Sequence, residues 1–263
     1  MTRPVSCNLR KSSLTIGSGI ALMVCLVPEA NAQISADILW LVDTSGSMAG
    51  DIAEVQTRIG QFNDVMMMNG IDAYYGLVEF GSGETLTQDI VPFSTFNASG
   101  SPFMTISTGG GFEQGSEAIN VGLANANFRS NSVRNVILVT DEDDDSDLTE
   151  FNNAIASLTA SNALFNFIGV PGVGNTDSRY GVLANDFSGA AFNILDFRNN
   201  PGPFFDNFIN TKVQEIIENA PENPPEQTPS VPEPNSLTML GVLSLFGAKK
   251  MTQKVLTKNN KAK

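Results

Sequence analysis

Short apolar runs alternate with amphipathic segments through the centre of this chain, and this alternation constrains the fold more than any other feature. Residues 38–42 (ILWLV) and 136–139 (VILV) are continuous apolar runs, which are typical of strands buried on both faces of a sheet. Residues 51–68 carry apolar side chains three and four positions apart, as one buried face of a helix requires. Strands that alternate with helices predict a doubly wound α/β sheet.

The remaining apolar segments extend the same pattern. Residues 73–80 and 85–91 are separated by Gly-Ser-Gly, which predicts a hairpin and therefore one antiparallel edge strand in a mostly parallel sheet. We expect further strands at 164–170 and 191–195, and helices on both faces of the sheet. The helices include one whose buried face carries Leu148, Phe151, Ile155 and Leu158, and a last one running from Phe205 to Ile217.

Composition excludes several classes of function. The chain has 28 acidic and 15 basic side chains, and residues 33–230 alone carry 26 acidic against 6 basic ones, so this region repels nucleic acids and anionic lipids. It has no histidine, and both cysteines, Cys7 and Cys25, lie near the N-terminus. Imidazole and thiol chemistry are therefore excluded from the central region, and any metal there must be held by oxygen.

The first 32 residues have the pattern of a secretory signal peptide. Arg3, Arg10 and Lys11 precede an apolar stretch at 14–27, and Ala-Asn-Ala at 30–32 offers small residues for cleavage. The alternative is a retained membrane anchor, although the stretch is shorter than the roughly 20 residues that span a bilayer. We expect an exported protein, located in the cell envelope, on the surface or outside a bacterium of the Gram-negative type, a cyanobacterium included.

The C-terminal segment has a second targeting pattern. A proline-rich linker at 220–230 leads into Val-Pro-Glu-Pro at 231–234, an apolar run at 237–248 and then two lysines. In this order, residues 231–263 resemble the PEP-CTERM sorting signal, which implies recognition by an exosortase and transient membrane anchoring through residues 237–248. An ordinary terminal helix is the alternative.

Oxygen-bearing side chains follow the first predicted strand. Asp43, Ser45 and Ser47 alternate, so in an extended loop they point the same way, at the strand edge where such sheets bind ligands. This Asp-x-Ser-x-Ser pattern resembles the metal-ion-dependent adhesion site (MIDAS) of von Willebrand factor A (VWA) domains, and the resemblance implies a VWA domain at 33–219. A helix cap by Ser47 is the alternative explanation of this motif.

Two more loops supply carboxylates to the same candidate site. Glu113 stands where most VWA domains carry a threonine, an arrangement similar to that of integrin β subunits, and Asp141 follows the strand at 136–139. The resemblance implies that both serines coordinate the ion directly, whereas Asp43 and Asp141 act largely through water. The acidic run at 141–147 is either a solvated loop, with Asp147 capping the next helix, or a weak accessory calcium site.

These features predict binding rather than catalysis. A magnesium or calcium ion held at Asp43, Ser45, Ser47, Glu113 and Asp141 would keep a position open for a carboxylate of a protein or extracellular polymer partner. The surface segments 93–108 and 171–180 are candidates for partner specificity by position alone. The alternatives are a structural envelope or matrix protein that calcium neutralises, and a metal-assisted hydrolase, for which no histidine base is available.

Overall fold

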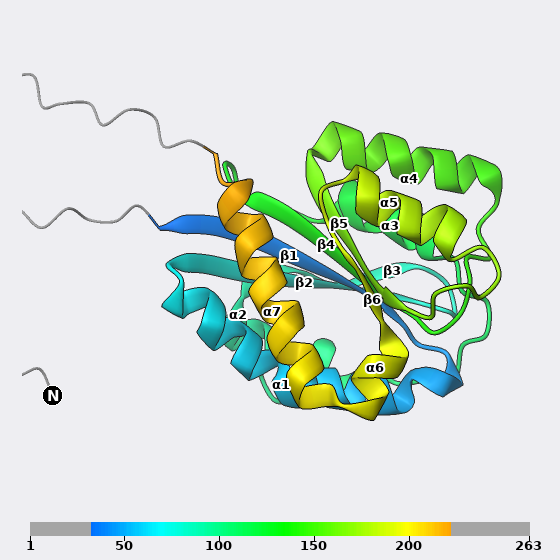
Figure 1. The fold of residues 1–263 in the computed structure, drawn as a ribbon, viewed down its shortest axis with the longest axis horizontal. Helices are drawn as coiled ribbons and strands as arrows, with labels where there is room; N and C mark the ends of the chain where they lie inside the picture. The colour runs from blue at the N-terminus through cyan, green and yellow to red at the C-terminus, as the bar shows by residue number, and fades with distance from the viewer. Residues whose placement is uncertain (1–32, 222–263) are drawn as a thin grey trace, which may run out of the picture. The chain divides into compact units, whose positions relative to one another are not determined.

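Residues 33–221 are described by a computed structural model (Figure 1). The signal-peptide pattern, nearly all of the proline-rich linker and the sorting-signal resemblance, including residues 237–248, lie outside the described residues. Within residues 33–221, six strands form one sheet in the order β3-β2-β1-β4-β5-β6. The strands are β1 (Ile34–Asp43), β2 (Ile71–Phe80), β3 (Thr85–Pro92), β4 (Val133–Val139), β5 (Ala163–Gly169) and β6 (Ala191–Asn193).

The sheet has the predicted mixed topology. Only the edge strand β3 runs antiparallel to its neighbour, β2, and the other pairings are parallel. The helices of the described region are α1 (Ala49–Met68), α2 (Phe93–Phe96), α3 (Gly115–Asn125), α4 (Leu148–Ser161), α5 (Val182–Asp186), α6 (Ile194–Asn199) and α7 (Pro201–Glu218). The doubly wound α/β fold with one antiparallel edge strand is therefore confirmed.

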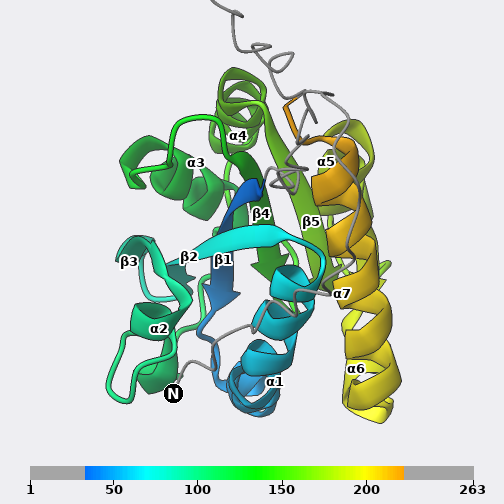
Figure 2. The same ribbon diagram turned by 90° about the vertical axis from the view of Figure 1, so that its left-hand side faces the viewer.

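Helices cover both faces of the sheet, as Figures 1 and 2 show. Ile38, Trp40 and Val42 of β1 pack in one core with residues of α1, α6 and α7. Leu39 and Leu41 pack on the opposite face with α3, α4 and α5. Because successive side chains of a strand point to opposite faces, a strand covered on both sides needs the unbroken apolar run that the sequence shows.

The helical predictions hold for α1 and in part elsewhere. The apolar stripe of α1, which consists of Ile52, Val55, Ile59, Phe62 and Met66, is buried throughout. On α4 the expected buried face is wrong at two positions, because Leu148 is 66% and Ile155 36% exposed, whereas Ala154 and Leu158 are buried. Ile217 on α7 is likewise exposed. The amphipathic spacing predicted the helices, but it did not predict which of their apolar residues are exposed.

The strand expected at 191–195 ends early. β6 stops at Asn193, whose side chain accepts a 2.9 Å hydrogen bond from the Leu195 backbone N–H and so caps α6. An asparagine that satisfies a free N–H at a helix start favours helix over strand for the residues after it. No helix within residues 33–221 is long and apolar enough to span a membrane.

Candidate functional site

Asp43 ends β1 with its side chain buried beneath the loop that follows. Its Oδ1 atom accepts a 2.7 Å hydrogen bond from the Ser45 backbone N–H, and its Oδ2 atom accepts one of 2.7 Å from the Thr140 hydroxyl. The parallel register pairs Val42 with Val139, so the residues that follow the two strands emerge side by side. Sequence reasoning singled out Asp43 but not Thr140, whose hydroxyl fixes the Asp43 carboxylate.

Three of the predicted site residues are joined directly. The Ser45 and Ser47 hydroxyl oxygens lie 3.0 Å apart, and the Ser47 hydroxyl donates a 2.9 Å hydrogen bond to Asp141 Oδ1. Ser47 lies inside a short 3₁₀ turn, Gly46–Met48, and no side chain caps α1. The helix-cap explanation of the motif is therefore wrong, and the two serines are free to present their oxygens at one place.

A glycine loop holds Glu113 next to this cluster. The N–H groups of Gly109 and Gly110 both donate to the Thr44 carbonyl, and that of Gly111 donates to Gly81 O at 2.8 Å. A Cβ atom on Gly110 would lie only 2.2 Å from the Gly81 oxygen, so only glycine permits this close approach. The loop consequently runs against the residues that follow β1 and delivers Glu113, which is buried, to the site.

Negative charge accumulates at Glu113. Burial, together with the neighbouring Asp43, Asp145 and Glu142 carboxylates, raises the pKa of Glu113 to about 7. Burial also raises the pKa of Asp43, although hydrogen bonds from Ser45 and Thr140 oppose the shift. Each of these acids is therefore held where its charge is costly unless a positive group compensates it.

A positive group that was not predicted from the sequence pairs with two other acids, Asp141 and Asp51. Arg198 of α6 donates from Nη2 to Asp141 Oδ2 at 2.7 Å and to Asp51 Oδ2 at 2.6 Å. Its hydrogen bonds with these acids raise the Arg198 pKa further above its ordinary value, so it stays charged. Asp51 lies in the first turn of α1, where it is buried and paired with Arg198. The partners are 57 and 147 residues apart, a separation at which local sequence carries no signal.

The acidic run after β4 is not a wholly solvated loop, because two of its aspartates bind residues in other parts of the domain. The Asp144 side chain is fully buried and pairs with Arg179 at 2.8 Å, and it also accepts hydrogen bonds from Ser116 of α3. Asp145 exchanges two hydrogen bonds with the Glu113 backbone. Asp147 caps α4 in a capping box with Glu150, as predicted. The loop thus fixes the start of α3 and, with it, the position of Glu113.

The donor set fits a hard cation only if the serines take part. No group of three His, Cys, Asp or Glu side chains is placed to hold a metal ion within residues 33–221. The cluster instead combines the Ser45 and Ser47 hydroxyls with the Asp141 carboxylate, and Asp43 and Glu113 lie beside it. All of these donors are oxygens, which are the ligands that Mg²⁺ and Ca²⁺ take. The structure therefore brings the five predicted site residues together. Asp43 and Asp141 are hydrogen-bonded to the serines, whereas Glu113 makes no hydrogen bond to them.

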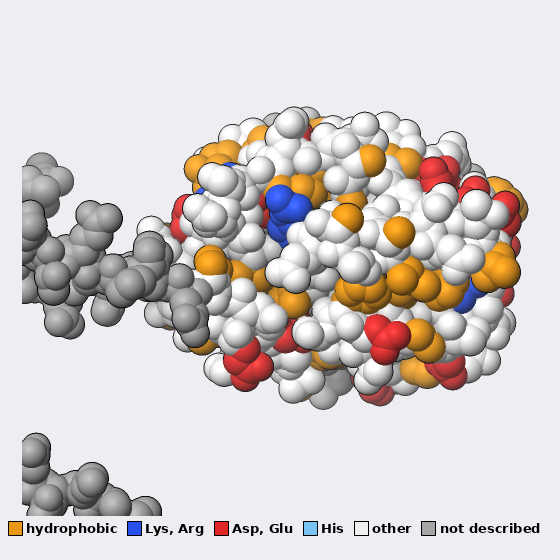
Figure 3. All heavy atoms as spheres, turned by 90° about the horizontal axis from the view of Figure 1, so that it is seen from above, with side chains coloured by type: hydrophobic (Ala, Val, Ile, Leu, Met, Phe, Trp, Pro, Cys, Tyr) orange, Lys and Arg blue, Asp and Glu red, His pale blue; other side chains and the backbone are white. Residues whose placement is uncertain are grey.

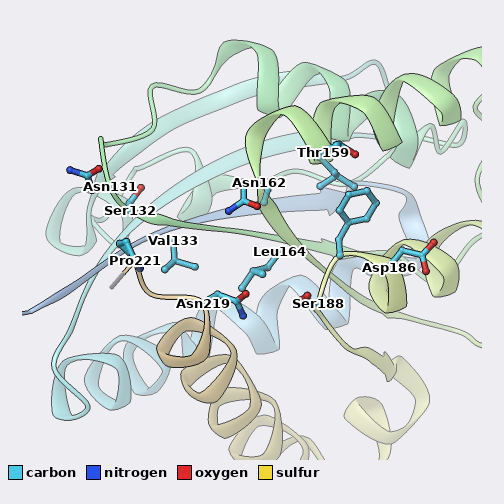
Figure 4. Close-up of a pocket in the computed structure, with 13 residues that line it drawn as sticks. Asn131, Ser132, Val133, Thr159, Asn162, Leu164, Asp186, Ser188, Asn219 and Pro221 are labelled. Atoms are coloured by element: carbon cyan, nitrogen blue, oxygen red, sulfur yellow. The ribbon is translucent and has the colours of Figure 1, made fainter. Parts of the chain in front are cut away.

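Two hollows differ in their relation to this cluster. One of about 400 Å³ begins at Thr44, which lies between Asp43 and Ser45, and is lined mostly by polar residues that include Ser107 and Thr108. Another of about 380 Å³ (Figure 4) lies at the opposite edge of the sheet, where Val133 and Leu164 begin or nearly begin their strands. Of these two, the first hollow is the one that shares a residue with the loop carrying Ser45 and Ser47.

The fold and site together define a doubly wound α/β domain with a cluster of polar side chains in the loops after β1 and β4. Residues 37–205 match the family described as von Willebrand factor type A domain. Since this match covers more than half of the chain, the protein belongs to the VWA family. No curated protein sequence matches the chain.

Solved structures agree with this fold. A von Willebrand factor type A protein from Catenulispora acidiphila is 14% identical with a TM-score of 0.52, covering 70% of this chain and 43% of that one. The conserved hypothetical protein BatB from Bacteroides thetaiotaomicron is 16% identical with a TM-score of 0.51, covering 70% and 98%. This chain thus spans less than half of the Catenulispora protein. At such identities the similarity shows the fold alone.

Proposed function

We propose that this VWA domain is an exported binding or adhesion module that depends on a divalent cation. VWA domains typically serve protein interaction or adhesion. The observation that carries the proposal is the continuous contact from Ser45 through Ser47 to Asp141, with Asp43 fixed behind it by Ser45 and Thr140. The signal-peptide pattern in residues 1–32 supports export.

The residues of this cluster would contribute two kinds of oxygen ligand to a magnesium or calcium ion. Ser45 and Ser47 offer neutral hydroxyls, while Asp43, Glu113 and Asp141 supply the charge. When bound, the ion supplies an open coordination position that accepts a carboxylate oxygen of a partner. Three acids outweigh a doubly charged ion, so this set favours firm retention of the ion over strong polarisation of its ligands.

Surface charge and shape restrict the partner. Acidic side chains are spread over the face in Figure 3, and lysine and arginine atoms are visible in few places. Five of the six basic side chains between residues 33 and 221 are already in ion pairs. A dense polyanion would therefore be repelled. A protein or polymer with a separate carboxylate and hydrogen-bonding groups for the hollow near Thr44 fits better, and this hollow includes part of segment 93–108.

Calorimetric titration with MgCl₂ and with CaCl₂ tests the proposal. Ser47→Ala removes one hydroxyl from an exposed position, so the fold should be retained, and Ser178→Ala is a matched control because the Ser178 hydroxyl bonds only the Asn175 carbonyl. We expect saturable binding to the unmodified protein and to Ser178→Ala, and at least tenfold weaker binding to Ser47→Ala. Equal, unsaturable heats in all three proteins would instead support a structural protein that cations merely neutralise.

A further inference from the structure

A buried lysine lies far from the candidate site in sequence and takes no part in it. Lys212 of α7 is fully buried, and its Nζ atom lies 2.8 Å and 2.7 Å from the two carboxylate oxygens of Glu215. The rings of Phe192 and Phe208 flank the ammonium at 5.1 Å and 5.6 Å. Lysine is rarely buried in this way, because an ammonium loses its hydration in an apolar core.

The same nitrogen contacts the side-chain amide of Asn166, which lies in the middle of β5. Lys212 Nζ lies directly against Asn166 Oδ1, and the Asn166 side chain is itself completely buried. The carbon of this amide is bonded to the contacted oxygen, so the amine and the amide carbon are neighbours. Holding two reacting groups together in this way replaces an encounter in solution with a step inside one molecule.

The surroundings of Asn166 suit attack on its amide carbon. Its Oδ1 atom accepts a 2.8 Å hydrogen bond from the Ala190 backbone N–H, which polarises the carbonyl and can stabilise charge on that oxygen. Its Nδ2 group donates at 2.9 Å to Asn135 Oδ1, which fixes the orientation of the amide. The Asn135 Nδ2 atom is buried with no partner of its own, so this network of amides is incompletely satisfied as it stands.

We propose that Lys212 and Asn166 form an intramolecular amide bond, with Glu215 transferring the protons. Glu215 first takes a proton from the Lys212 ammonium. The neutral Nζ then attacks Asn166 Cγ, and the carbonyl electron pair moves onto Oδ1, where the Ala190 N–H lies. Glu215 passes its proton to Nδ2 and accepts one from Nζ. When the carbonyl reforms, the Cγ–Nδ2 bond breaks and ammonia leaves.

The step needs no external reagent. Of the three protons on the Lys212 ammonium, one leaves in the ammonia, one stays on the new amide nitrogen and one remains on Glu215. Burial, only partly opposed by Glu215, lowers the pKa of Lys212 to about 8, which increases the neutral amine available near neutral pH. No oxidant, metal or cofactor is consumed.

The bond would connect α7 covalently to the middle of β5, next to the edge strand β6. Residues 33–221 contain no cysteine, so a disulfide cannot make such a connection in this domain. The cross-link would enclose residues 166–212, which include β6, α6 and Arg198. It would therefore also limit the movement of the segment that carries Arg198 to Asp141.

Mass spectrometry of the purified protein tests the proposal directly. We expect the intact mass to fall short of the sequence mass by one ammonia, relative to a Lys212→Met variant purified with the same chain ends. After denaturation, trypsin should not cleave after Lys212, and a branched peptide should join the fragment containing Asn166 to the fragment containing Lys212. A full mass together with cleavage after Lys212 would overturn the proposal and leave an ordinary buried ion pair.

Two further variants test the assigned roles. Glu215→Gln keeps the side-chain size but removes the proton acceptor, so the ammonia deficit should disappear or form much more slowly. Asn166→Asp changes the leaving group, so the deficit should become one water. An undiminished ammonia deficit in Glu215→Gln would overturn the role of Glu215, and an ammonia deficit retained in Asn166→Asp would overturn the role of Asn166. Circular dichroism of each variant shows that it is folded.

Discussion

Arg198 donates a 2.7 Å hydrogen bond from Nη2 to Asp141 Oδ2, and this contact joins α6 to the loop after β4 at the candidate site. The other Asp141 oxygen accepts a hydrogen bond from Ser47. One carboxylate therefore lies between an internal cation and the proposed cation ligands. The Arg198 guanidinium and a bound divalent ion would therefore compete for the negatively charged Asp141 carboxylate.

We predict that Arg198→Gln binds divalent cations more tightly. Without the guanidinium, Asp141 keeps its full charge for the ion, so the dissociation constant for Mg²⁺ should fall roughly tenfold, or about 1.4 kcal/mol. In the absence of cation, Arg198→Gln should melt at a lower temperature than the parent protein, because the buried Asp51 loses its ion-pair partner. Calorimetric titration and thermal unfolding with and without Mg²⁺ measure both effects.

Arg58→Gln is the matched control for this prediction. Arg58 pairs with Glu54 four residues earlier on the partly exposed side of α1, and such pairs contribute only about 0.3–0.5 kcal/mol. Arg58→Gln should leave Mg²⁺ affinity unchanged. Weaker binding in Arg198→Gln, or an equal gain in both variants, would contradict the proposed competition for Asp141.

We predict that Gly110→Ala weakens cation binding while Gly111→Ala does not. A methyl group at position 110 would collide with the Gly81 carbonyl, whereas position 111 has open space around it. Displacing the loop at Gly110 moves Glu113 away from the serines, and we expect a loss of at least tenfold in Mg²⁺ affinity. Titration of both variants distinguishes this positional effect from a general effect of losing a glycine. Equal affinities would show that the loop does not position a ligand.

We predict that Thr140→Val also weakens cation binding and that Thr140→Ser restores it. The Thr140 hydroxyl donates to Asp43 Oδ2 and accepts from the Glu142 backbone N–H. Valine preserves the shape but leaves the buried Asp43 carboxylate without that donor, which costs about 1–3 kcal/mol. Thermal unfolding and titration of the two variants measure these effects. A Thr140→Val protein that behaves like the parent would contradict the role of this hydroxyl.

The main features of the fold were predictable from sequence because they depend on local periodicity and chain order. The apolar runs at 38–42 and 136–139 mark strands buried on both faces, and the alternation of elements determines which strand ends share an edge. This reasoning brought Asp43, Ser45, Ser47 and Asp141 to one place, as their contacts show. It says nothing about which distant side chain completes the site.

What sequence reasoning missed depends on long-range packing. Arg198 reaches Asp141 only because α6 begins where β6 ends early, at Asn193, and the sequence was interpreted there as a longer strand. The burial of Lys212 was also missed, since it follows from how α7 lies against β5. Asp144 was grouped with its exposed neighbours, although Ser116 and Arg179 hold it in the interior.

We predict a pH-dependent loss of stability for Asp144→Asn. Burial alone would raise the Asp144 pKa, but hydrogen bonds from Ser116, Arg179 and Ser146 outweigh it and lower the pKa below the ordinary value of 3.8. The carboxylate therefore contributes stability above about pH 4, and this contribution is lost as pH falls through its lower pKa in the folded state. Asp144→Asn should cost about 3 kcal/mol in the free energy of unfolding at pH 7.

Denaturant unfolding at pH 7 and pH 3 measures this dependence. The difference between Asp144→Asn and the parent protein should shrink at pH 3, which is below the ordinary carboxyl pKa of 3.8, because the unfolded parent chain takes up a proton at Asp144 there. A difference of the same size at both pH values would show that Asp144 acts through shape rather than through its charge.

Crystals grown with MnCl₂ provide the most direct test of the central claim, because Mn²⁺ also takes oxygen ligands and is located by its anomalous scattering. The account predicts an anomalous peak beside the Ser45 and Ser47 hydroxyls, within reach of Glu113 and Asp141 either directly or through water. Full manganese sites elsewhere on the acidic surface, with none beside the two serines, would contradict it.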